Sequence, residues 1–431
     1  MTELKDSGIE WIGKIPNNWK VKRIQFCLDE INEKNIPVKT EQVLSLVKDK
    51  GVMLYEDKGN QGNKAKEDVR QYKIAYPYTL IVNSMNILIG SVGISDYLGC
   101  VSPVYYVFKE TVDSDLRYIN YIFNTREFQK ELRKYANGIL EIRLRVSSSD
   151  IFKRKIPLPD KATEIIIADF LDKKCVEIDA LYSDIEQQIE TLEEYKKSII
   201  TEALTKGLDP NVEMKDSGIK WIGLIPEKWS IGKIKSYVNK VGSGKTPKGD
   251  DKLYTEGNVL FLRSQNIYNT GIVLDDIPTA ITDIIDEEMS NTRVIFDDVL
   301  LNITGGSIGR CCIYNLENRA NVNQHVSIIR TKKDKILPAY MHYFWISNLG
   351  QSAIRLYQTG GNREGMSAEA IKNTPIPIMS IREQESIINF LNVKCIEIDA
   401  TIEDKQQQLE ILKQYKKSLI YEYVTGKKEV P

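Results

Sequence analysis

Phe170–Thr205 reads FLDKKCVEIDALYSDIEQQIETLEEYKKSIITEALT, and Phe390–Thr425 reads FLNVKCIEIDATIEDKQQQLEILKQYKKSLIYEYVT. The two stretches are offset by 220 residues and are identical at 20 of 36 positions. Similarity at a fixed spacing indicates an internal repeat, and a repeat constrains the architecture more than any local pattern does. The chain of 431 residues is therefore built from two copies of one plan.

A second pair of matching stretches opens each copy. Lys5–Ile24 reads KDSGIEWIGKIPNNWKVKRI, and Lys215–Ile234 reads KDSGIKWIGLIPEKWSIGKI, with 12 of 20 positions identical. Between this box and the repeated stretch lies a block, about 25–155 in one copy and 235–375 in the other, that shows little similarity between copies. The pattern fits a protein that recognises two different targets with two copies of one scaffold. The alternative is a duplication whose middle blocks have drifted apart.

The repeated stretches are predicted to be long helices that pack against each other. Neither 160–208 nor 378–430 contains proline, and apolar residues recur at alternating steps of three and four, as in a coiled coil. About 43 residues give a helix of roughly 60 Å. Such a helix must bury its apolar stripe to be stable. We expect an antiparallel pair that brings the termini together; a clasp within the chain or a zipper between two chains is the alternative. Three lysines interrupt the apolar seam: Lys196, Lys405 and Lys416.

Local signals mark the helix ends and the content of the middle blocks. Asp160 and Ser380 are expected N-caps, and Gly207 followed by Pro210 is expected to end the first helix. The blocks read as mixed α and β, so the fold class is α/β of the mixed α+β kind. Strands are expected at 72–83, 101–108, 138–146, 259–263, 299–303 and 326–330, and helices at 116–135, 340–349 and 352–357.

Composition excludes several classes of protein. Apolar residues make up 42% of the chain, which is ordinary for a globular protein, and no run approaches the roughly 18 apolar residues of a membrane span. The opening MTELKDSGIEW contains no apolar signal core, so we expect a cytoplasmic protein. The six cysteines include no CxxC pair and suggest reduced, buried thiols. With only two histidines, we expect no metal site.

Charge permits DNA binding without establishing it. The net charge is −1, but residues 1–159 carry 25 basic and 20 acidic side chains, and 211–380 carry 20 and 18. The intervening 160–210 carries 6 basic and 13 acidic side chains. Arginine pairs with guanine and asparagine or glutamine with adenine, while lysine more often binds phosphate. On this basis the candidate DNA-binding residues are Lys64, Lys66, Arg70, Asn83, Asn86, Arg143, Arg145, Lys245, Thr246, Lys248, Arg263, Gln265, Asn266, Arg310, Asn323, Gln324 and Arg363.

Several stretches resemble catalytic motifs but lack the residues that those motifs require. Gly242–Thr246 resembles a phosphate-binding loop, but Asn239 stands where the pattern requires glycine. The glycine-rich Asp297–Arg310 is better read as a tight strand–turn–strand. His325 has no evident carboxylate partner and is expected to be structural. We therefore expect no catalytic residues in this chain.

These features carry a resemblance to a known family. WIGKIPNNW (Trp11–Trp19), its copy WIGLIPEKW (Trp221–Trp229), the linker Gly207–Val212 and the paired YKKSII and YKKSLI resemble specificity subunits of Type I restriction–modification systems. The two blocks resemble different subtypes of target recognition domain. The resemblance covers essentially the whole chain.

The resemblance implies a domain organisation and a set of partners. It predicts a target recognition domain at 1–159, a central spacer helix at 160–210, a second recognition domain at 211–380 and a C-terminal spacer helix at 381–431. Each recognition domain would read one half of an asymmetric, bipartite site in double-stranded DNA. Two modification subunits would dock on the helices and methylate adenine at N6 with S-adenosylmethionine. Restriction subunits, using ATP and magnesium, would add cleavage for host defence.

The chain itself would then hold no cofactor and no catalytic residue. The alternative function is a non-catalytic tandem adaptor scaffold built on a coiled coil. DNA binding with a steep salt dependence would distinguish the two, because only DNA contact releases counterions.

Overall fold

The computed structural model describes residues 3–48, 50–59, 68–111, 113–138, 144–247, 257–358 and 365–431. The chain divides into two compact units. Unit 1 comprises Met1–Glu186 and Gln407–Pro431, and unit 2 comprises Gln187–Gln406. Helix α4 (Lys161–Lys206) and helix α9 (Ile381–Val424) each contribute one segment to unit 1 and one to unit 2.

The two long helices begin where the sequence predicts. The Asp160 carboxylate accepts a hydrogen bond from the Thr163 amide at 3.0 Å, and the Ser380 hydroxyl accepts one from the Glu383 amide at 3.3 Å. Gly207 ends α4 with a positive φ of 74°, a conformation that glycine adopts without steric cost. With 46 and 44 residues, the helices are slightly longer than expected.

Unit 1 is built around a four-stranded antiparallel sheet in the order β4-β11-β8-β9. Helix α1 packs on β8 and β9. The strands of unit 1 are β1 (Leu4–Asp6), β2 (Lys14–Pro16), β3 (Lys20–Arg23), β4 (Leu28–Glu30), β5 (Leu44–Val47), β6 (Gly51–Leu54), β7 (Lys73–Ala75), β8 (Thr79–Asn83), β9 (Val92–Ser95), β10 (Gly99–Val101), β11 (Tyr105–Glu110) and β12 (Lys155–Leu158). Its shorter α-helices are α1 (Leu116–Phe123), α2 (Arg126–Arg133) and α3 (Ser148–Lys153).

Unit 2 repeats this sheet in the order β16-β25-β22-β23 and adds a second one in the order β20-β17-β24-β21. Helix α6 packs on β22, β23 and β25. The strands are β13 (Met214–Asp216), β14 (Leu224–Pro226), β15 (Ser230–Lys233), β16 (Val238–Ser243), β17 (Val259–Leu262), β18 (Ile267–Tyr268), β19 (Gly271–Ile272), β20 (Ala280–Ile281), β21 (Arg293–Val294), β22 (Val299–Asn302), β23 (Cys311–Ile313), β24 (Ala320–Val322), β25 (Val326–Thr331) and β26 (Pro375–Ile378). The shorter α-helices are α5 (Asp283–Glu288), α6 (Pro338–Ile346), α7 (Asn348–Tyr357) and α8 (Ala368–Asn373).

The two four-stranded sheets agree in register as well as in order. Tyr105 pairs with Asn83 in unit 1, and Val326 pairs with Asn302 in unit 2. The middle blocks, which show little sequence similarity, therefore each contain a core sheet of the same topology. The physical reason is that pairing depends on backbone hydrogen bonds and an alternating apolar pattern, both of which tolerate many sequences.

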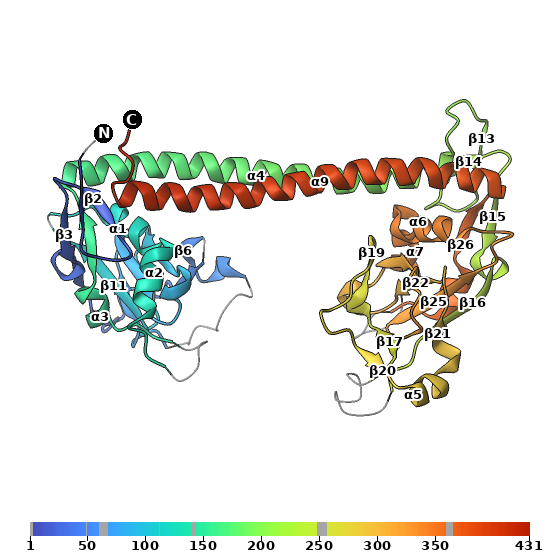
Figure 1. The fold of residues 1–431 in the computed structure, drawn as a ribbon, viewed down its shortest axis with the longest axis horizontal. Helices are drawn as coiled ribbons and strands as arrows, with labels where there is room; N and C mark the ends of the chain where they lie inside the picture. Colours follow the sequence, from blue (N-terminus) through green and yellow to red (C-terminus); the bar gives the residue numbers. More distant parts are fainter. Residues whose placement is uncertain are drawn as a thin grey trace. The chain divides into compact units, whose positions relative to one another are not determined.

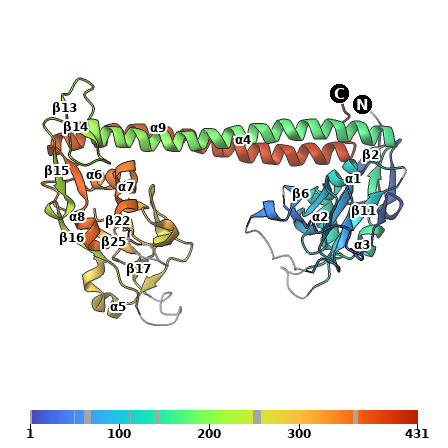
Figure 2. The same ribbon diagram turned by 180° about the vertical axis from the view of Figure 1, so that it is seen from behind.

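In each unit the segments of α4 and α9 lie side by side and antiparallel (Figure 1 and Figure 2). In unit 1 the Phe170 ring lies 4.6 Å from the Tyr423 ring, and Lys416 forms a 2.6 Å ion pair with Asp179. In unit 2 Lys196 forms a 2.6 Å ion pair with Asp399, and Lys405 donates to Gln188. The lysines that interrupt the apolar seam thus each bind a polar partner on the facing helix.

Matching tyrosines attach each block to its long helix. In unit 1 the Tyr118 hydroxyl donates to the Val424 and Pro157 carbonyls, and in unit 2 the Tyr340 hydroxyl donates to the Pro377 carbonyl at 3.0 Å. The Tyr121 hydroxyl donates to Asp172 at 2.6 Å. The Tyr343 hydroxyl donates at 2.7 Å to Asn392, the repeat counterpart of Asp172. The contacts to Pro157 and Asp172 in unit 1 thus recur at the equivalent Pro377 and Asn392 in unit 2.

Other expectations are met with small differences. The strand expected at 72–83 is split into β7 and β8 by a turn at Tyr78, whose φ is +60°. The helix expected at 116–135 is split into α1 and α2, because Thr125 caps a new helix with its hydroxyl. Most of the strand expected at 138–146 lies outside the described residues. All six cysteines are buried as free thiols, and among the described residues no helix is long and apolar enough to span a membrane.

Candidate nucleic-acid interface

Two equivalent loop edges contain several of the predicted DNA-binding residues. Edge 1, in unit 1, consists of the turn 83–91 after β8 and the turn 102–105 before β11. Edge 2, in unit 2, consists of the turn 302–310 after β22 and the turn 323–326 before β25. In each unit the pair of turns lies at one end of that unit's core sheet. Asn83 pairs with Tyr105 there in unit 1, and Asn302 pairs with Val326 in unit 2.

The same backbone hydrogen bonds shape both edges. The Asn83 amide donates to the Ser91 carbonyl at 3.1 Å, and the Asn302 amide donates to the Arg310 carbonyl at 2.8 Å. Glycines at equivalent positions, with φ of 85° at Gly90 and 89° at Gly309, allow the chain to turn back into the sheet. The side chains before and after each glycine are thereby held at the rim of the sheet.

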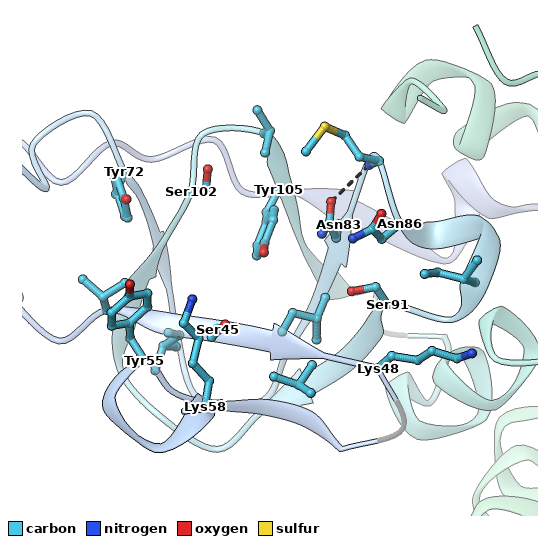
Figure 3. A pocket seen from close by; sticks show the side chains of 17 residues that line it. Ser45, Lys48, Tyr55, Lys58, Tyr72, Asn83, Asn86, Ser91, Ser102 and Tyr105 are labelled. Carbon is cyan, nitrogen blue, oxygen red and sulfur yellow. Dashed lines mark hydrogen bonds between the residues drawn. The ribbon is translucent and has the colours of Figure 1, made fainter. Parts of the chain in front are cut away.

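Edge 1 borders a hollow of about 420 Å³ between β5 and the ends of β8 and β11 (Figure 3). Its wall contains three tyrosines, Tyr55, Tyr72 and Tyr105, and its polar groups come from serine and asparagine side chains. The Lys58 ammonium lies 4.1 Å from the centre of the Tyr55 ring, in cation–π geometry. Burial, and then the neighbouring Tyr72, raise the pKa of Tyr105, so its hydroxyl stays protonated and can donate a hydrogen bond.

The charge of the hollow favours an anionic ligand. Lys48 and Lys58 are the charged residues that line it, and no carboxylate does so among the described residues. This is unlike the chain as a whole, where 60 acidic residues balance 59 basic ones. The predicted residues Asn83 and Asn86 both lie in the wall. The Asn83 side-chain oxygen accepts from the Met85 amide, whereas Asn86 is exposed.

Two neighbouring chain segments are held against edge 2 by hydrogen bonds. The Asn302 side-chain amide donates to the Ser264 carbonyl at 2.8 Å and to the Ser307 hydroxyl at 3.1 Å. The Lys245 amide donates to the Val322 carbonyl at 3.1 Å. The backbone approaches so closely there that a Cβ on Gly244 would lie 1.9 Å from that carbonyl oxygen, so only glycine fits.

The structure brings together many of the predicted residues. Asn323, Gln324 and Arg310 belong to edge 2; Lys245 and Arg263 adjoin it, because the Lys245 amide binds Val322 and the Asn323 amide donates to the Leu262 carbonyl. Arg145 adjoins edge 1 through the Val146 amide, which donates to the Ser84 carbonyl. Thr246 and Gln265 are exposed; Thr246 directly follows Lys245, and Gln265 lies two residues after Arg263. Lys64, Lys66, Arg143, Lys248 and Arg363 lie outside the described residues.

Several predicted residues are engaged within the chain, including Asn323, whose side-chain oxygen accepts a hydrogen bond from the His325 amide at 3.1 Å. Asn266 is buried, and its amide group both accepts from the Arg263 amide at 3.0 Å and donates to the Val273 carbonyl at 2.9 Å. Arg70 forms an exposed ion pair with Asp68, its neighbour but one. In this structure Asn266 therefore shapes the loop beside edge 2, and Arg70 lies outside both edges.

Residues that sequence reasoning missed also occupy the edges. Ser91, Ser102 and Tyr105 line the hollow, and Asn302 lies at the base of edge 2 with its side-chain oxygen unpaired among the described residues. A weak signal was available: Asn83 and Asn302 each end an apolar run and are each followed six residues later by Ile-Gly. Serine and tyrosine alone carry no such signal.

The described residues contain no group of three or more His, Cys, Asp or Glu side chains that could hold a metal ion. His325 is hydrogen-bonded through Nδ1 to the Thr304 hydroxyl at 2.5 Å and joins two turns of edge 2. Burial lowers the pKa of His342 to about 4.

Comparison with known proteins supports the resemblance to specificity subunits of Type I restriction–modification systems. Residues 226–419 match the Type I restriction modification DNA specificity domain. The Type I restriction enzyme MjaVIII specificity subunit of Methanocaldococcus jannaschii is 27% identical over 323 residues, covering 74% of this chain and 71% of the relative. The putative MjaX specificity subunit of the same organism is 23% identical over 438 residues, covering 96% and 95%.

Solved structures show the same fold. The HsdS subunit from Thermoanaerobacter tengcongensis matches with a TM-score of 0.50 at 14% identity, covering 96% of this chain and 98% of that chain. A chain from a structural study of the assembly and conformational transition of the type I R-M system matches with a TM-score of 0.70 at 12% identity, covering 95% and 98%. The repeat, the fold and these near full-length matches agree: the chain belongs to the specificity subunits of Type I restriction–modification systems, the non-catalytic subunits that recognise the DNA target sequence.

Proposed function

We propose that this specificity subunit reads an asymmetric bipartite DNA site, one half with each recognition domain. The observation that carries the proposal is the convergence of predicted DNA-binding residues at two equivalent edges, one in each unit. The domains would comprise 1–159 and 211–380, joined by spacer helices at 160–210 and 381–431. The two edges carry different side chains, so the half-sites should differ in sequence.

The test is co-expression of the chain with its modification subunit in a host that lacks adenine methylation. Sequencing of methylated adenines across the genome should then reveal a split motif with unlike halves. A motif read as a perfect palindrome by one copy of the chain would contradict the asymmetry. A soluble complex that neither methylates DNA nor binds it with a steep salt dependence would support the adaptor scaffold instead.

The helices α4 and α9 are proposed to set the distance between the half-sites. Their lengths of 46 and 44 residues correspond to roughly 65–70 Å. This length exceeds one turn of B-DNA, about 34 Å. Inserting or deleting matched residues near Ile185–Leu192 and in the facing part of α9 should change the number of unspecified base pairs between the halves. Unchanged spacing in a variant that still methylates would exclude the ruler role.

The repeated helices also present matching exposed apolar residues that we assign to partner docking. Val176 in unit 1 and Ile396 in unit 2 occupy equivalent repeat positions, and each is 69% exposed. Tyr415 and Tyr195 are a second exposed pair. Exposed apolar side chains that recur in both copies fit two copies of one partner, the modification subunit.

Single substitutions would test this docking. Val176→Glu and Ile396→Glu should each reduce the number of bound modification subunits from two toward one, measured by native mass spectrometry. Leu181→Glu is the matched control, since Leu181 is also exposed but corresponds to Thr401 in the other repeat. Loss of both subunits in the control as well would indicate misfolding rather than docking.

The cofactors are proposed to belong to the partners. S-adenosylmethionine would bind the modification subunit, and ATP with magnesium would bind a restriction subunit. The expected place of action is the cytoplasm, where the chromosome is methylated.

A further inference from the structure

Edge 1 and edge 2 place different side chains at equivalent backbone positions. The register of the core sheet aligns Ser91 with Arg310, because each carbonyl accepts from the asparagine that ends the preceding strand. It also aligns Ser102 with Asn323, because the amides of Tyr105 and Val326 donate to their carbonyls at 2.9 Å and 3.2 Å. The loop lengths match at both turns, so the comparison needs no gap.

The chemistry at these positions is what would distinguish one base pair from another. Unit 1 has a small hydroxyl at both positions and a hollow beside them. Unit 2 has the guanidinium of Arg310 and the side-chain amide of Asn323, whose oxygen accepts a hydrogen bond from the His325 backbone amide at 3.1 Å. Arginine binds the two acceptors of guanine with a fork of two donors, whereas serine makes a single hydrogen bond and does not discriminate. The same site would therefore prefer different bases in the two units.

Arg310 is available for such a contact. Its guanidinium lies 4.7 Å from the centre of the Tyr268 ring, and among the described residues it forms no ion pair. Arg293, Arg319 and Arg330 of the same unit are all paired with carboxylates. Stacking on an aromatic ring orients a guanidinium while leaving its N–H groups free to donate. Arg310 therefore differs from the structural arginines around it.

We propose that edge 1 and edge 2 are one DNA-reading site built twice, and that the residues at the Ser91/Arg310 and Ser102/Asn323 positions determine which base pairs each half-site contains. The ligand is the base edges of double-stranded DNA, with Arg310 reading a guanine in the half-site of unit 2. This inference rests on the proposed function, since it assigns residues to the half-sites.

Exchanging the equivalent residues tests the proposal. In the co-expression assay, Arg310→Ser should weaken discrimination at one G·C pair of one half-site by about tenfold or more and leave the other half unchanged. Ser91→Arg should alter only the other half-site, and Ser102→Asn should act on the same half as Ser91→Arg. Asn323→Ser should act with Arg310→Ser.

Two further variants separate reading from folding. Arg310→Lys keeps the charge but loses the paired donors, so it should relax the base preference while the complex still binds DNA with the same salt dependence. Arg355→Ser, at an exposed position on α7 outside edge 2, should leave the methylated motif unchanged.

The outcomes are distinguishable from failure of the proposed function. Absence of a bipartite motif with the wild-type chain would refute the proposed function itself. With that motif in hand, the inference is overturned if the Ser91 and Arg310 variants alter the same half-site. It is also overturned if the motif is unchanged in both, or if methylation falls equally at all sites.

Discussion

Glu164 and Gln384 occupy equivalent positions in the two repeats and accept equivalent hydrogen bonds, one with a carboxyl group and the other with an amide. Each is fully buried near the start of a long helix and accepts a hydrogen bond from the backbone amide that precedes a shorter helix. The Gln384 amide nitrogen also donates to the Lys335 and Met379 carbonyls, whereas one oxygen of Glu164 has no partner among the described residues. Burial raises the pKa of Glu164 to about 7, because a charged carboxylate is poorly solvated there.

Glu164→Gln is therefore expected to stabilise the protein in a pH-dependent way. The folded state holds the Glu164 proton more tightly than the unfolded state, whose pKa is near 4.5. The free energy of unfolding thus falls as the pH rises through about 7. The substitution should raise this free energy by about 1–3 kcal/mol at pH 8, and by less at pH 5. Denaturant unfolding at the two pH values measures the difference.

The reverse substitution provides the control. Gln384→Glu places a carboxyl group in the equivalent buried position and should destabilise the protein, more at pH 8 than at pH 5. An equal effect of Glu164→Gln at both pH values would show that ionisation of the buried carboxyl group does not destabilise the folded state.

At the scale of elements, the packing of α4 against α9 contains one ion pair used twice. Lys196 with Asp399 and Lys416 with Asp179 are related by the repeat, and each pair has a 2.6 Å contact. Polar contacts in an apolar seam favour one register over others, because a shifted pairing would bury the lysines without partners. The lysines that appeared to weaken the coiled coil thus help to specify it.

A double-mutant cycle tests this pair. Lys196→Asp should destabilise the chain, and adding Asp399→Lys should recover part of the loss, with a coupling energy of about 0.5–1 kcal/mol. The value is modest because Asp399 is 44% exposed and solvent screens the attraction. Thermal unfolding of the four variants gives the coupling, and strictly additive losses would rule out a direct interaction. High salt should reduce the coupling.

At the scale of the whole molecule, the C-terminal tail and the central linker are counterparts. Gly207, after α4, lies against Trp229 of the second box, and Gly426, after α9, lies against Trp19 of the first. The Tyr421 hydroxyl donates to the Trp11 carbonyl at 3.0 Å. Within unit 1, the segment after α9 therefore contacts the first box. Within unit 2, the linker after α4 contacts the second box in the same way.

Circular permutation should consequently be tolerated. A chain opened in the linker 208–212, with a short glycine–serine segment joining the original ends, should fold with unchanged helix content and methylate the same motif. Circular dichroism and methylation sequencing would check these two properties. A chain opened at Gln187–Gln188 is the control and should be much less stable, because that break interrupts α4. Equal loss of folding in both permutants would contradict the equivalence.

Much of the fold could be predicted from the sequence, and less of the site. The long helices were predictable because helical periodicity is local and the two copies support each other. The shared core sheet was not, because strand pairing joins residues far apart in the chain, and Thr79–Asn83 and Val299–Asn302 have few residues in common. Asn86 and Arg310 were recognisable as candidates by type, but Ser91 and Ser102 were not.

By itself, the sequence determined the repeat, the helices with their caps, and the family, since these depend on spacing and identity along the chain. Only the tertiary structure decided that the two dissimilar blocks contain the same core sheet and that their loops form equivalent edges. It also decided that Asn266 is occupied by internal hydrogen bonds while Arg310 forms no ion pair within the described residues. The physical reason is that a side chain's availability depends on which distant backbone groups it meets, and backbone pairing places different side chains at the same position.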